Sequence, residues 1–346
     1  MRVLIPDAKF TDGAAVETAT AGPAFAFRPN HGIHQDEIAP EEWRRCDGVI
    51  AYDEVRLDRP WLTAMERARV VVRAGVGYDN VDLELAGQLG IAVCNVPDYG
   101  TTDVADHALA MLLTLTRGTA MYDEALRRDP VAGWRFDGPP LMRRLRGQVF
   151  GVVGLGRIGL AAALRARAFG MDIAFYDPYL PTGAELALGF RRVPRLADLM
   201  AGSDVVSVHT PLTPETRGLI GEAALAAAKP GLILINTARG PVVDLDALHA
   251  ALASGRVAGA ALDVLPVEPL ARDLDHPLIA AWRGQESWIA GRLLISPHSA
   301  FYSPASIHDL RRKSAEVLAA ALGEGRLVNC VNRAWLGGRR GWQASA

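Results

Sequence analysis

Cysteine is scarce in this sequence, with three residues in a chain of 346. Cys46, Cys94 and Cys330 are odd in number and far apart, and no Cys-x-x-Cys pair occurs. This pattern excludes a disulfide framework and a cysteine zinc site, and we expect no metal. Isolated thiols of this kind are typical of a reducing compartment, so we expect a cytoplasmic protein with reduced cysteines.

The sequence also has no large excess of either charge: it contains 37 Lys and Arg and 39 Asp and Glu, for a net charge of −2. Without a basic run, we expect neither a nucleic-acid partner nor a membrane partner. The best apolar run, residues 104–116, is shorter than the roughly 18–20 residues that span a bilayer, and it contains Asp106 and His107. The first residues predict a short strand and not a signal peptide.

What the sequence does contain is enough material for about two domains of roughly 150 residues each. Half of its residues (50%) are hydrophobic. Short β-branched runs alternate with stretches of helical periodicity, which predicts an α/β fold built on doubly wound parallel sheets. The predicted strands are 3–5, 48–52, 70–73, 91–94, 148–153, 172–176, 204–209, 232–236, 258–262 and 293–296. The main predicted helices are 82–89, 102–117, 157–169 and 303–322, and 129–146 is predicted to be irregular.

A glycine-rich turn follows the predicted strand 148–153. Gly154, Gly156 and Gly159 form the pattern Gly-x-Gly-x-x-Gly between that strand and a predicted helix, which is the setting that a dinucleotide-binding loop requires. Asp177 ends the next predicted strand, where a carboxylate accepts hydrogen bonds from a ribose and repels a 2′-phosphate. The pattern therefore favours an NAD site over its alternative, a structural glycine turn beside a surface aspartate.

Three polar residues follow later predicted strands, at the sheet edge where doubly wound folds bind ligands. They are Arg239, Glu268 and His298. An arginine fork grips a carboxylate, a histidine supplies a proton, and a neighbouring glutamate raises the pKa of that histidine, which is the set that keto-acid reduction needs. Taken alone, the arginine is also typical of a surface ion pair, the glutamate of a solvated charge, and the histidine of a packed or exposed ring. The spacing of the three residues in the sequence does not show that they converge.

With these motifs in this order, the sequence resembles the D-isomer-specific 2-hydroxyacid dehydrogenases from about residue 3 to residue 332. Besides the glycine loop, the shared motifs are Asn236-Thr237-Ala238-Arg239-Gly240, Asp263-Val264 with Glu268-Pro269, and Pro297-His298. Within the family the sequence is most similar to the C-terminal binding protein branch, on segments 92–97, 164–170, 175–180 and 329–332.

The resemblance implies two doubly wound parallel-sheet domains, a Rossmann NAD-binding domain and a flavodoxin-like substrate domain. The substrate domain is expected to be discontinuous, comprising 1–98 and 302–332, with the NAD-binding domain at 99–301 and a tail at 333–346. A homodimer is also expected, because the helix 102–117 and the segment 129–146 exceed what one nucleotide domain needs and two-fold dimers are the commonest soluble oligomers.

The resemblance also implies residue roles. Arg239 would bind and orient the substrate, Glu268 would pair with the imidazole, and His298 would be the acid/base. The loop that follows the predicted strand 70–73 would bind the substrate carboxylate, although the same residues also suit an ordinary turn. The substrate-binding residues besides Arg239 would be Arg73, Val76, Gly77 and Phe301. Asp263 would hold the nicotinamide carboxamide. The other cofactor-binding residues would be Val76, Gly154, Leu155, Gly156, Arg157, Ile158, Gly159, Asp177, Thr210, Pro211, Thr216, Thr237 and Ala238.

The expected function is an NAD-dependent dehydrogenase that interconverts a small 2-keto acid and its D-2-hydroxy acid. One alternative is an NAD(H)-sensing scaffold of the C-terminal binding protein type, which keeps the same residues. A second alternative is another NAD-dependent Rossmann enzyme, such as a hydrolase that uses NAD as a redox relay. This sequence contains no substrate motif that matches such an enzyme. The sequence departs in two places from the branch that it resembles: Phe301 stands where that branch carries a tryptophan, and the stretch 270–292, with Trp282 and Trp288, is longer than expected.

Overall fold

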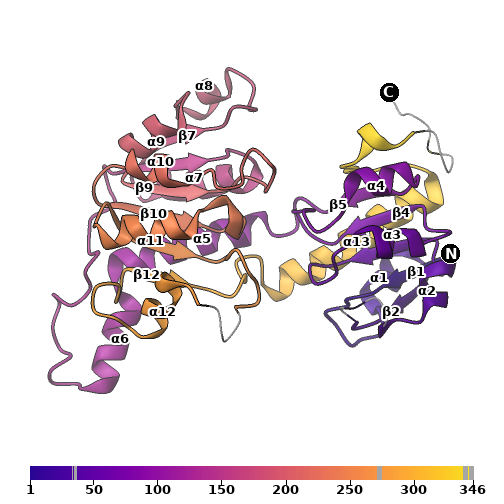
Figure 1. The fold of residues 1–346 in the computed structure, drawn as a ribbon, viewed down its shortest axis with the longest axis horizontal. Coiled ribbons are helices and arrows are strands. Elements are labelled where there is room, and N and C mark those ends of the chain that lie inside the picture. Colours follow the sequence, from indigo (N-terminus) through magenta and orange to yellow (C-terminus); the bar gives the residue numbers. More distant parts are fainter. Residues whose placement is uncertain (33, 35–36, 271–274, 338–341, 343–346) are drawn as a thin grey trace. The chain divides into compact units, whose positions relative to one another are not determined.

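A computed structural model describes residues 1–32, 34, 37–270, 275–337 and 342 of the chain. It divides into two compact units, which are described separately (Figure 1). Unit 1 comprises Met1–Gly100 and Tyr302–Ala346, and unit 2 comprises Thr101–Phe301. Each unit is built on one parallel β-sheet, which confirms the predicted α/β class.

Unit 1 has a five-stranded parallel sheet with the order β2-β1-β3-β4-β5. This is the strand order of flavodoxin-like folds. Its strands are β1 (Arg2–Ile5), β2 (Ala26–Pro29), β3 (Gly48–Ala51), β4 (Val70–Arg73) and β5 (Ala92–Asn95). Its helices are α1 (Ala15–Ala21), α2 (Pro40–Arg45), α3 (Arg59–Ala64), α4 (Leu83–Gln88) and α13 (Pro304–Glu324), with a 3-10 turn at Arg333–Trp335.

Alternating side chains give the unit 1 sheet two apolar faces. In β4, Val70 and Val72 belong to the core beneath α13, whereas Val71 belongs to the core that includes the tryptophans of α2 and α3. Successive side chains of a strand point to opposite faces, so a fully apolar strand is the expected result of burial on both sides. The sequence did not predict β2, because it is an edge strand with two exposed or half-exposed ends and a terminal proline.

Unit 2 has a seven-stranded parallel sheet with the order β12-β11-β10-β9-β6-β7-β8, which contains the Rossmann order. Its strands are β6 (Val149–Val153), β7 (Asp172–Tyr176), β8 (Arg191–Arg192), β9 (Val205–Val208), β10 (Leu232–Asn236), β11 (Val257–Leu262) and β12 (Leu293–Ile295). Its helices are α5 (Thr101–Arg117), α6 (Thr119–Arg128), α7 (Arg157–Ala168), α8 (Ala184–Leu188), α9 (Leu196–Gly202), α10 (Glu222–Ala226), α11 (Leu245–Ala253) and α12 (Pro277–Arg283), with a 3-10 turn at Gly240–Val242.

The helices of unit 2 cover both faces of its sheet. α5 packs against α7 over one face, in a core that joins Leu109 and Leu112 to Ala163 and Phe150. The other face is covered by α9, α10, α11 and α12. Besides α7, α5 contacts β10 and β11 of the sheet, so apolar side chains on more than one side of this helix are buried.

Two segments that the sequence singled out have a definite place in unit 2. Residues 129–148 contain no helix or strand, and all of them are described. The longer stretch 270–292 contains α12, and Trp282 and Trp288 pack against the core of unit 2. Residues 271–274 of that stretch, and residues 338–341 and 343–346 of the predicted tail, lie outside the described residues.

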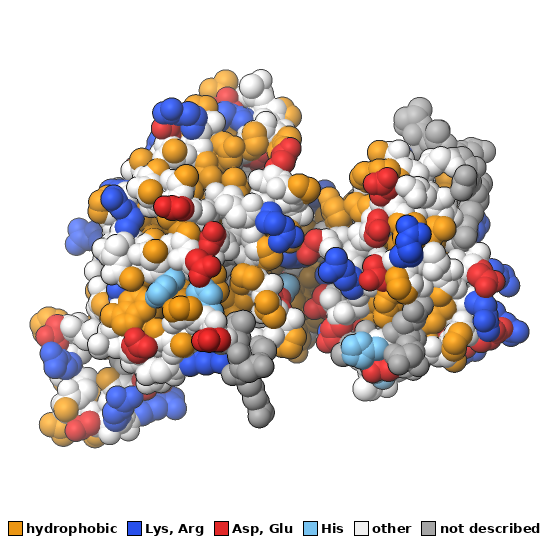
Figure 2. Space-filling view, in the orientation of Figure 1, with side chains coloured by type: hydrophobic (Ala, Val, Ile, Leu, Met, Phe, Trp, Pro, Cys, Tyr) orange, Lys and Arg blue, Asp and Glu red, His pale blue; other side chains and the backbone are white. Residues whose placement is uncertain are grey.

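Charges of both signs are interspersed over the face of the molecule shown in Figure 2, without a broad basic surface. Among the described residues, no helix is both long enough and apolar enough to cross a membrane. Within the same part of the chain, no cluster of three or more His, Cys, Asp or Glu side chains is arranged to hold a metal ion.

Candidate functional site

The glycine loop joins β6 to α7 and has the shape of a phosphate cradle. Gly154 adopts a φ of 88°, which permits the sharp turn after the strand. A Cβ atom added at Gly159 would lie 2.1 Å from the carbonyl oxygen of Gly154, so helix and loop touch there, whereas Gly156 has open space around it. Gly156 is also the N-cap of α7 and no side chain caps that end. The first N–H groups of the helix are therefore available to an anion such as a pyrophosphate.

Unpartnered polar groups lie at the ends of the neighbouring strands. Nδ1 of His209 and the hydroxyls of Thr210 and Thr237 are buried and have no hydrogen-bond partner within the described chain. Burial lowers the pKa of His209 to about 4, so its ring is neutral at physiological pH. Buried polar groups are normally hydrogen-bonded. A polar ligand beside the loop would supply the missing partners, and these residues therefore fit a bound dinucleotide.

Asp177 connects the end of β7 to the glycine loop. One carboxylate oxygen accepts a hydrogen bond from the backbone N–H of Leu155 at 2.9 Å, and the other accepts from those of Tyr179 and Leu180 at 3.0 and 3.1 Å. A carboxylate has about four acceptor sites. One acceptor site therefore remains, at the position where a dinucleotide fold presents a carboxylate to the ribose.

His298 and Glu268 form a hydrogen-bonded pair. Nδ1 of His298 lies 2.6 Å from Oε2 of Glu268, and both side chains are about one-third exposed, at 30% and 34%. The other carboxylate oxygen of Glu268 accepts a hydrogen bond from the backbone N–H of Leu265 at 2.7 Å. Phe301 lies edge-on to the imidazole, with 6.1 Å between the ring centres. The glutamate is thus held by the backbone on one side and orients the imidazole on the other.

A buried carboxylate shapes the turn that carries His298. Asp263, at the end of β11, is 1% exposed. Its side chain accepts hydrogen bonds from the backbone N–H groups of Ser299 and Ala300 at 3.0 and 2.9 Å, and its carbonyl accepts from that of His298 at 2.7 Å. These bonds hold His298 at a φ of 51°, in the left-handed region that non-glycine residues seldom adopt. The role of Asp263 toward the nicotinamide carboxamide stays a prediction.

His107 and Ser296 complete this network, and the sequence did not predict them as site residues. The hydroxyl of Ser296 donates to Asp263 at 2.5 Å, and Nε2 of His107 lies 3.0 Å from that hydroxyl. Because the serine gives its only proton to the carboxylate, Nε2 of His107 is the donor in the second bond. The signal available in the sequence was a histidine within the otherwise apolar helix 102–117.

Arg239 stands on a turn that packs against the segment carrying Glu268. The side chain of Asn236, which is fully buried, bonds the carbonyl of Arg239 and the N–H of Ala238. A Cβ atom added at Gly240 would lie 2.0 Å from the backbone of Leu265, so the two loops touch. Unit 2 therefore contains Arg239, Glu268, His298 and Phe301, on loops that follow β10, β11 and β12. The same unit contains the glycine loop, which follows β6.

Arg73, Val76 and Gly77 belong to unit 1. The guanidinium of Arg73 is buried and donates to the carbonyl of Ala74 at 3.0 Å, and the side chain of Asn95 donates to the carbonyl of Val76 at 2.7 Å. These bonds shape the loop after β4, and its substrate-binding role stays a prediction.

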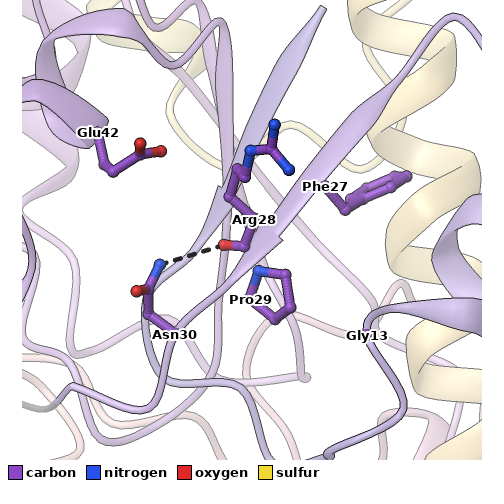
Figure 3. Close-up of a pocket in the computed structure, with 6 residues that line it drawn as sticks. All are labelled: Gly13, Phe27, Arg28, Pro29, Asn30 and Glu42. Atoms are coloured by element: carbon purple, nitrogen blue, oxygen red, sulfur yellow. Dashed lines mark hydrogen bonds between the residues drawn. The ribbon is translucent and has the colours of Figure 1, made fainter.

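A cavity of about 420 Å³ in the same unit is lined by none of the predicted site residues. Figure 3 shows its lining, which consists of Gly13, Phe27, Arg28, Pro29, Asn30 and Glu42.

Comparison with known proteins connects this geometry to one family. Residues 109–300 match the model of the NAD-binding domain of D-isomer specific 2-hydroxyacid dehydrogenases. The chain is 36% identical over 304 residues, or 86% of its length, to C-terminal-binding protein 1 of Caenorhabditis elegans. It is 41% identical over 278 residues, or 79% of its length, to D-3-phosphoglycerate dehydrogenase of Mycobacterium bovis. The matches cover 40% and 50% of those relatives, so the chain spans half of their length or less.

A solved structure extends the similarity to both units. The chain resembles D-lactate dehydrogenase of Aquifex aeolicus, solved with NAD and lactic acid, with a TM-score of 0.80 and 27% identity. The match covers 95% of this chain and 99% of that enzyme.

Proposed function

This chain belongs to the D-isomer-specific 2-hydroxyacid dehydrogenase family, and from that premise we propose that it is an NAD-dependent oxidoreductase. It reduces a small 2-keto acid to the D-2-hydroxy acid and catalyses the reverse reaction. The observation that carries the proposal is the pairing of His298 with Glu268, on strand-end loops of the same unit as a glycine loop that fits a dinucleotide. Unit 2 is thus the NAD-binding domain, and unit 1 is assigned the substrate domain.

The protein residues supply the proton and the orientation of the substrate. NADH, when bound, supplies the hydride that reduces the keto carbon. Because an ionised carboxylate only accepts hydrogen bonds, Nδ1 of His298 carries the proton that faces Glu268. Nε2 is then the nitrogen that gives a proton to the substrate oxygen during reduction and removes it during oxidation. Arg239 binds the substrate carboxylate through its planar guanidinium fork and polarises the adjacent carbonyl.

We propose that NAD is preferred over NADP. The carboxylate of Asp177 would repel a 2′-phosphate, and the neighbouring cation Arg192 is already engaged. The guanidinium of Arg192 pairs with Glu185 and donates to the carbonyls of Asp177 and Leu180. Because the guanidinium of Arg192 is bound to these groups of the protein, it does not offset the repulsion between the carboxylate of Asp177 and a 2′-phosphate.

The test of the proposed activity is NADH oxidation with a panel of small 2-keto acids, followed by absorbance. Wild-type protein is expected to turn over at least one member of the panel. His298→Asn should lose on the order of 10²–10⁴-fold in turnover, the usual effect of a missing acid/base, while its NADH affinity stays that of the wild type. Tight NADH binding without turnover of any keto acid would contradict the proposal and favour the NAD(H)-sensing scaffold.

We also propose that the chain forms a homodimer through the segment 129–146. Val131, Trp134 and Phe136 of this segment are exposed at 85%, 81% and 89%. Neighbouring large apolar side chains that stand in solvent mark an interaction surface, and closed two-fold dimers are the commonest soluble assemblies. Light scattering should give a dimer mass for the wild type and a monomer mass for Trp134→Ser with Phe136→Ser. Leu186→Ser, which removes an 84% exposed leucine elsewhere in the unit, should remain a dimer.

The three cysteines support a reducing compartment, and we propose the cytoplasm. All three are free thiols, as is usual where glutathione and thioredoxin keep thiols reduced. Cell fractionation that recovers the protein outside the cytoplasm would contradict this assignment.

A further inference from the structure

Cys94 and Cys330 face each other across the edge of the unit 1 sheet. Cys94 lies in the edge strand β5, and residue 330 forms an antiparallel bridge with it. The flanking bonds run from the N–H of Val331 to the carbonyl of Val93 at 2.8 Å, and from the N–H of Asn95 to the carbonyl of Asn329 at 3.2 Å. The two cysteines are therefore a non-hydrogen-bonded antiparallel pair, with side chains on the same face of the sheet.

This kind of pair has the separation that a disulfide requires. Directly opposite residues of the non-hydrogen-bonded type have Cα atoms roughly 4.5 Å apart, and disulfides join Cα atoms about 4.4–6.8 Å apart. The thiol of Cys330 donates to the side-chain oxygen of Asn332 at 3.4 Å, which keeps the sulfur at this edge of the sheet. An S–S bond between Cys94 and Cys330 needs side-chain rotation and little backbone movement.

Asn332 holds this register in place. It is fully buried, its side-chain oxygen accepts a hydrogen bond from the N–H of Val93 at 2.8 Å, and its amide group donates to the carbonyl of Ile91 at 3.0 Å. The segment after α13 is thus bonded to β5 by both backbone and side chain. Cys330 cannot slide away from Cys94 without breaking these buried bonds.

The two thiols differ in reactivity and access. The hydrogen bond with Cys94 lowers the pKa of Cys330 to about 7, helped by nearby backbone N–H groups. The same hydrogen bond raises the pKa of Cys94, and its burial adds to the effect. Cys330 is partly exposed, whereas Cys94 is fully buried. The thiolate is the reactive form of cysteine, so an oxidant in solution meets Cys330 first and Cys94 is the resolving thiol.

We propose that Cys94 and Cys330 are a site of reversible oxidative modification that hydrogen peroxide converts to a disulfide. The thiolate of Cys330 attacks one peroxide oxygen, the O–O bond breaks, and a sulfenic acid forms with release of water after protonation. The sulfur of Cys94 then attacks the sulfenic sulfur, the S–S bond forms, and a second water leaves. The two thiols together lose two electrons and two protons, and one peroxide is reduced to two waters. A dithiol reductant restores both thiols by exchange.

Cys46 provides an internal control. It is buried, its thiol donates to the carbonyl of Trp43, and burial raises its pKa to about 12. At pH 7 its thiolate fraction is smaller than that of Cys330 by a factor on the order of 10⁴, so it should stay reduced while the pair reacts.

The experiment treats the full chain with stoichiometric hydrogen peroxide, alkylates the remaining thiols after denaturation and measures the intact mass. We expect loss of two hydrogens, one alkylated cysteine, and a proteolytic peptide that links Cys94 to Cys330, all reversed by dithiothreitol. The oxidation rate should rise with pH through about 7, as Cys330 ionises. Cys46→Ser should form the same link. Cys94→Ser should trap a sulfenic acid that dimedone captures.

The proposal fails if three cysteines remain alkylatable in the wild-type protein. It also fails if the linked peptide contains Cys46, or if Cys330 proceeds to a sulfinic acid without forming a link. Because peptide mapping of the wild type alone distinguishes these outcomes, the test does not depend on the variants folding. It is also independent of catalysis and of the proposed substrate.

Discussion

Replacing Asp177 with asparagine tests the proposed choice of cofactor. The change removes one negative charge at the end of β7 and keeps a side-chain oxygen. That oxygen still accepts from the N–H groups of Tyr179 and Leu180, but the new NH₂ group faces the N–H of Leu155, so one loop hydrogen bond is lost. Alanine would remove all three bonds and confuse loss of the loop with loss of recognition, so asparagine is the sharper perturbation.

The expected magnitude follows from two terms. The free acceptor site is on the oxygen that Leu155 bonds, which becomes the NH₂ group, so the ribose hydroxyl loses a charged acceptor. Hydrogen bonds to charged groups contribute about 1.5–3 kcal/mol, so NADH should bind at least about tenfold more weakly. Removing the carboxylate relieves a repulsion of about 1–2 kcal/mol against a 2′-phosphate at high effective dielectric, so NADPH should bind about tenfold more tightly. The ratio of the two dissociation constants should therefore shift by on the order of 10²-fold.

The assay is calorimetric titration of NADH and NADPH, which needs no substrate. Asp172→Asn is the matched control, because it removes the same charge from the exposed start of the same strand, roughly 16 Å away along β7. For Asp172→Asn, the ratio of the dissociation constants of NADH and NADPH should equal that of the wild type. The reasoning is refuted if Asp177→Asn leaves the ratio where it was while the thermal unfolding midpoint is unchanged, or if the two variants shift the ratio equally.

Three further outcomes are expected. Glu268→Gln should lower keto-acid turnover while NADH affinity stays that of the wild type, because a neutral amide orients the imidazole of His298 less firmly than a charged carboxylate does; unchanged turnover would contradict the pairing. Arg311→Met should lower the free energy of unfolding of unit 1 by about 3–5 kcal/mol in urea titrations. The change leaves Glu17, whose side chain is 1% exposed, without the guanidinium that binds both of its oxygens at 2.6 and 2.7 Å. A loss below about 1 kcal/mol would match a surface ion pair instead. Gly159→Ala should weaken NADH binding by about 5- to 150-fold in the same calorimetric titration. The added methyl would lie 2.1 Å from a carbonyl oxygen of the loop, and overpacking costs about 1–3 kcal/mol; wild-type affinity would show that the loop tolerates the methyl.

The sequence alone predicted most of the strands of both sheets and the type of fold. β4, β7 and β10 occupy the predicted residues, because a strand buried on both faces is a short run of apolar residues between turn signals. β2 and β8 were missed. One is an edge strand that ends in a proline, and the other consists of two arginines, so neither has the apolar pattern from which a strand is predicted.

The candidate site was predictable where a local pattern carries the chemistry. The glycine loop and the strand-end positions of Arg239, Glu268 and His298 depend on neighbours in the chain, so they could be recognised from spacing and from resemblance. The network behind His298 could not, because Ser296 and His107 are 189 residues apart and a histidine in an apolar helix is more often a packed side chain.

Sequence by itself determined the parallel α/β class and the residues that stand at strand ends, because hydrophobic periodicity and turn chemistry act between near neighbours. Tertiary structure decided which distant groups meet. The 2.6 Å contact of His298 with Glu268, the clamp of Arg311 on Glu17 across 294 positions, and the bridge between Cys94 and Cys330 all depend on strand order and register. These arise from packing the whole chain, where burial forces polar groups to find partners wherever the fold has brought them.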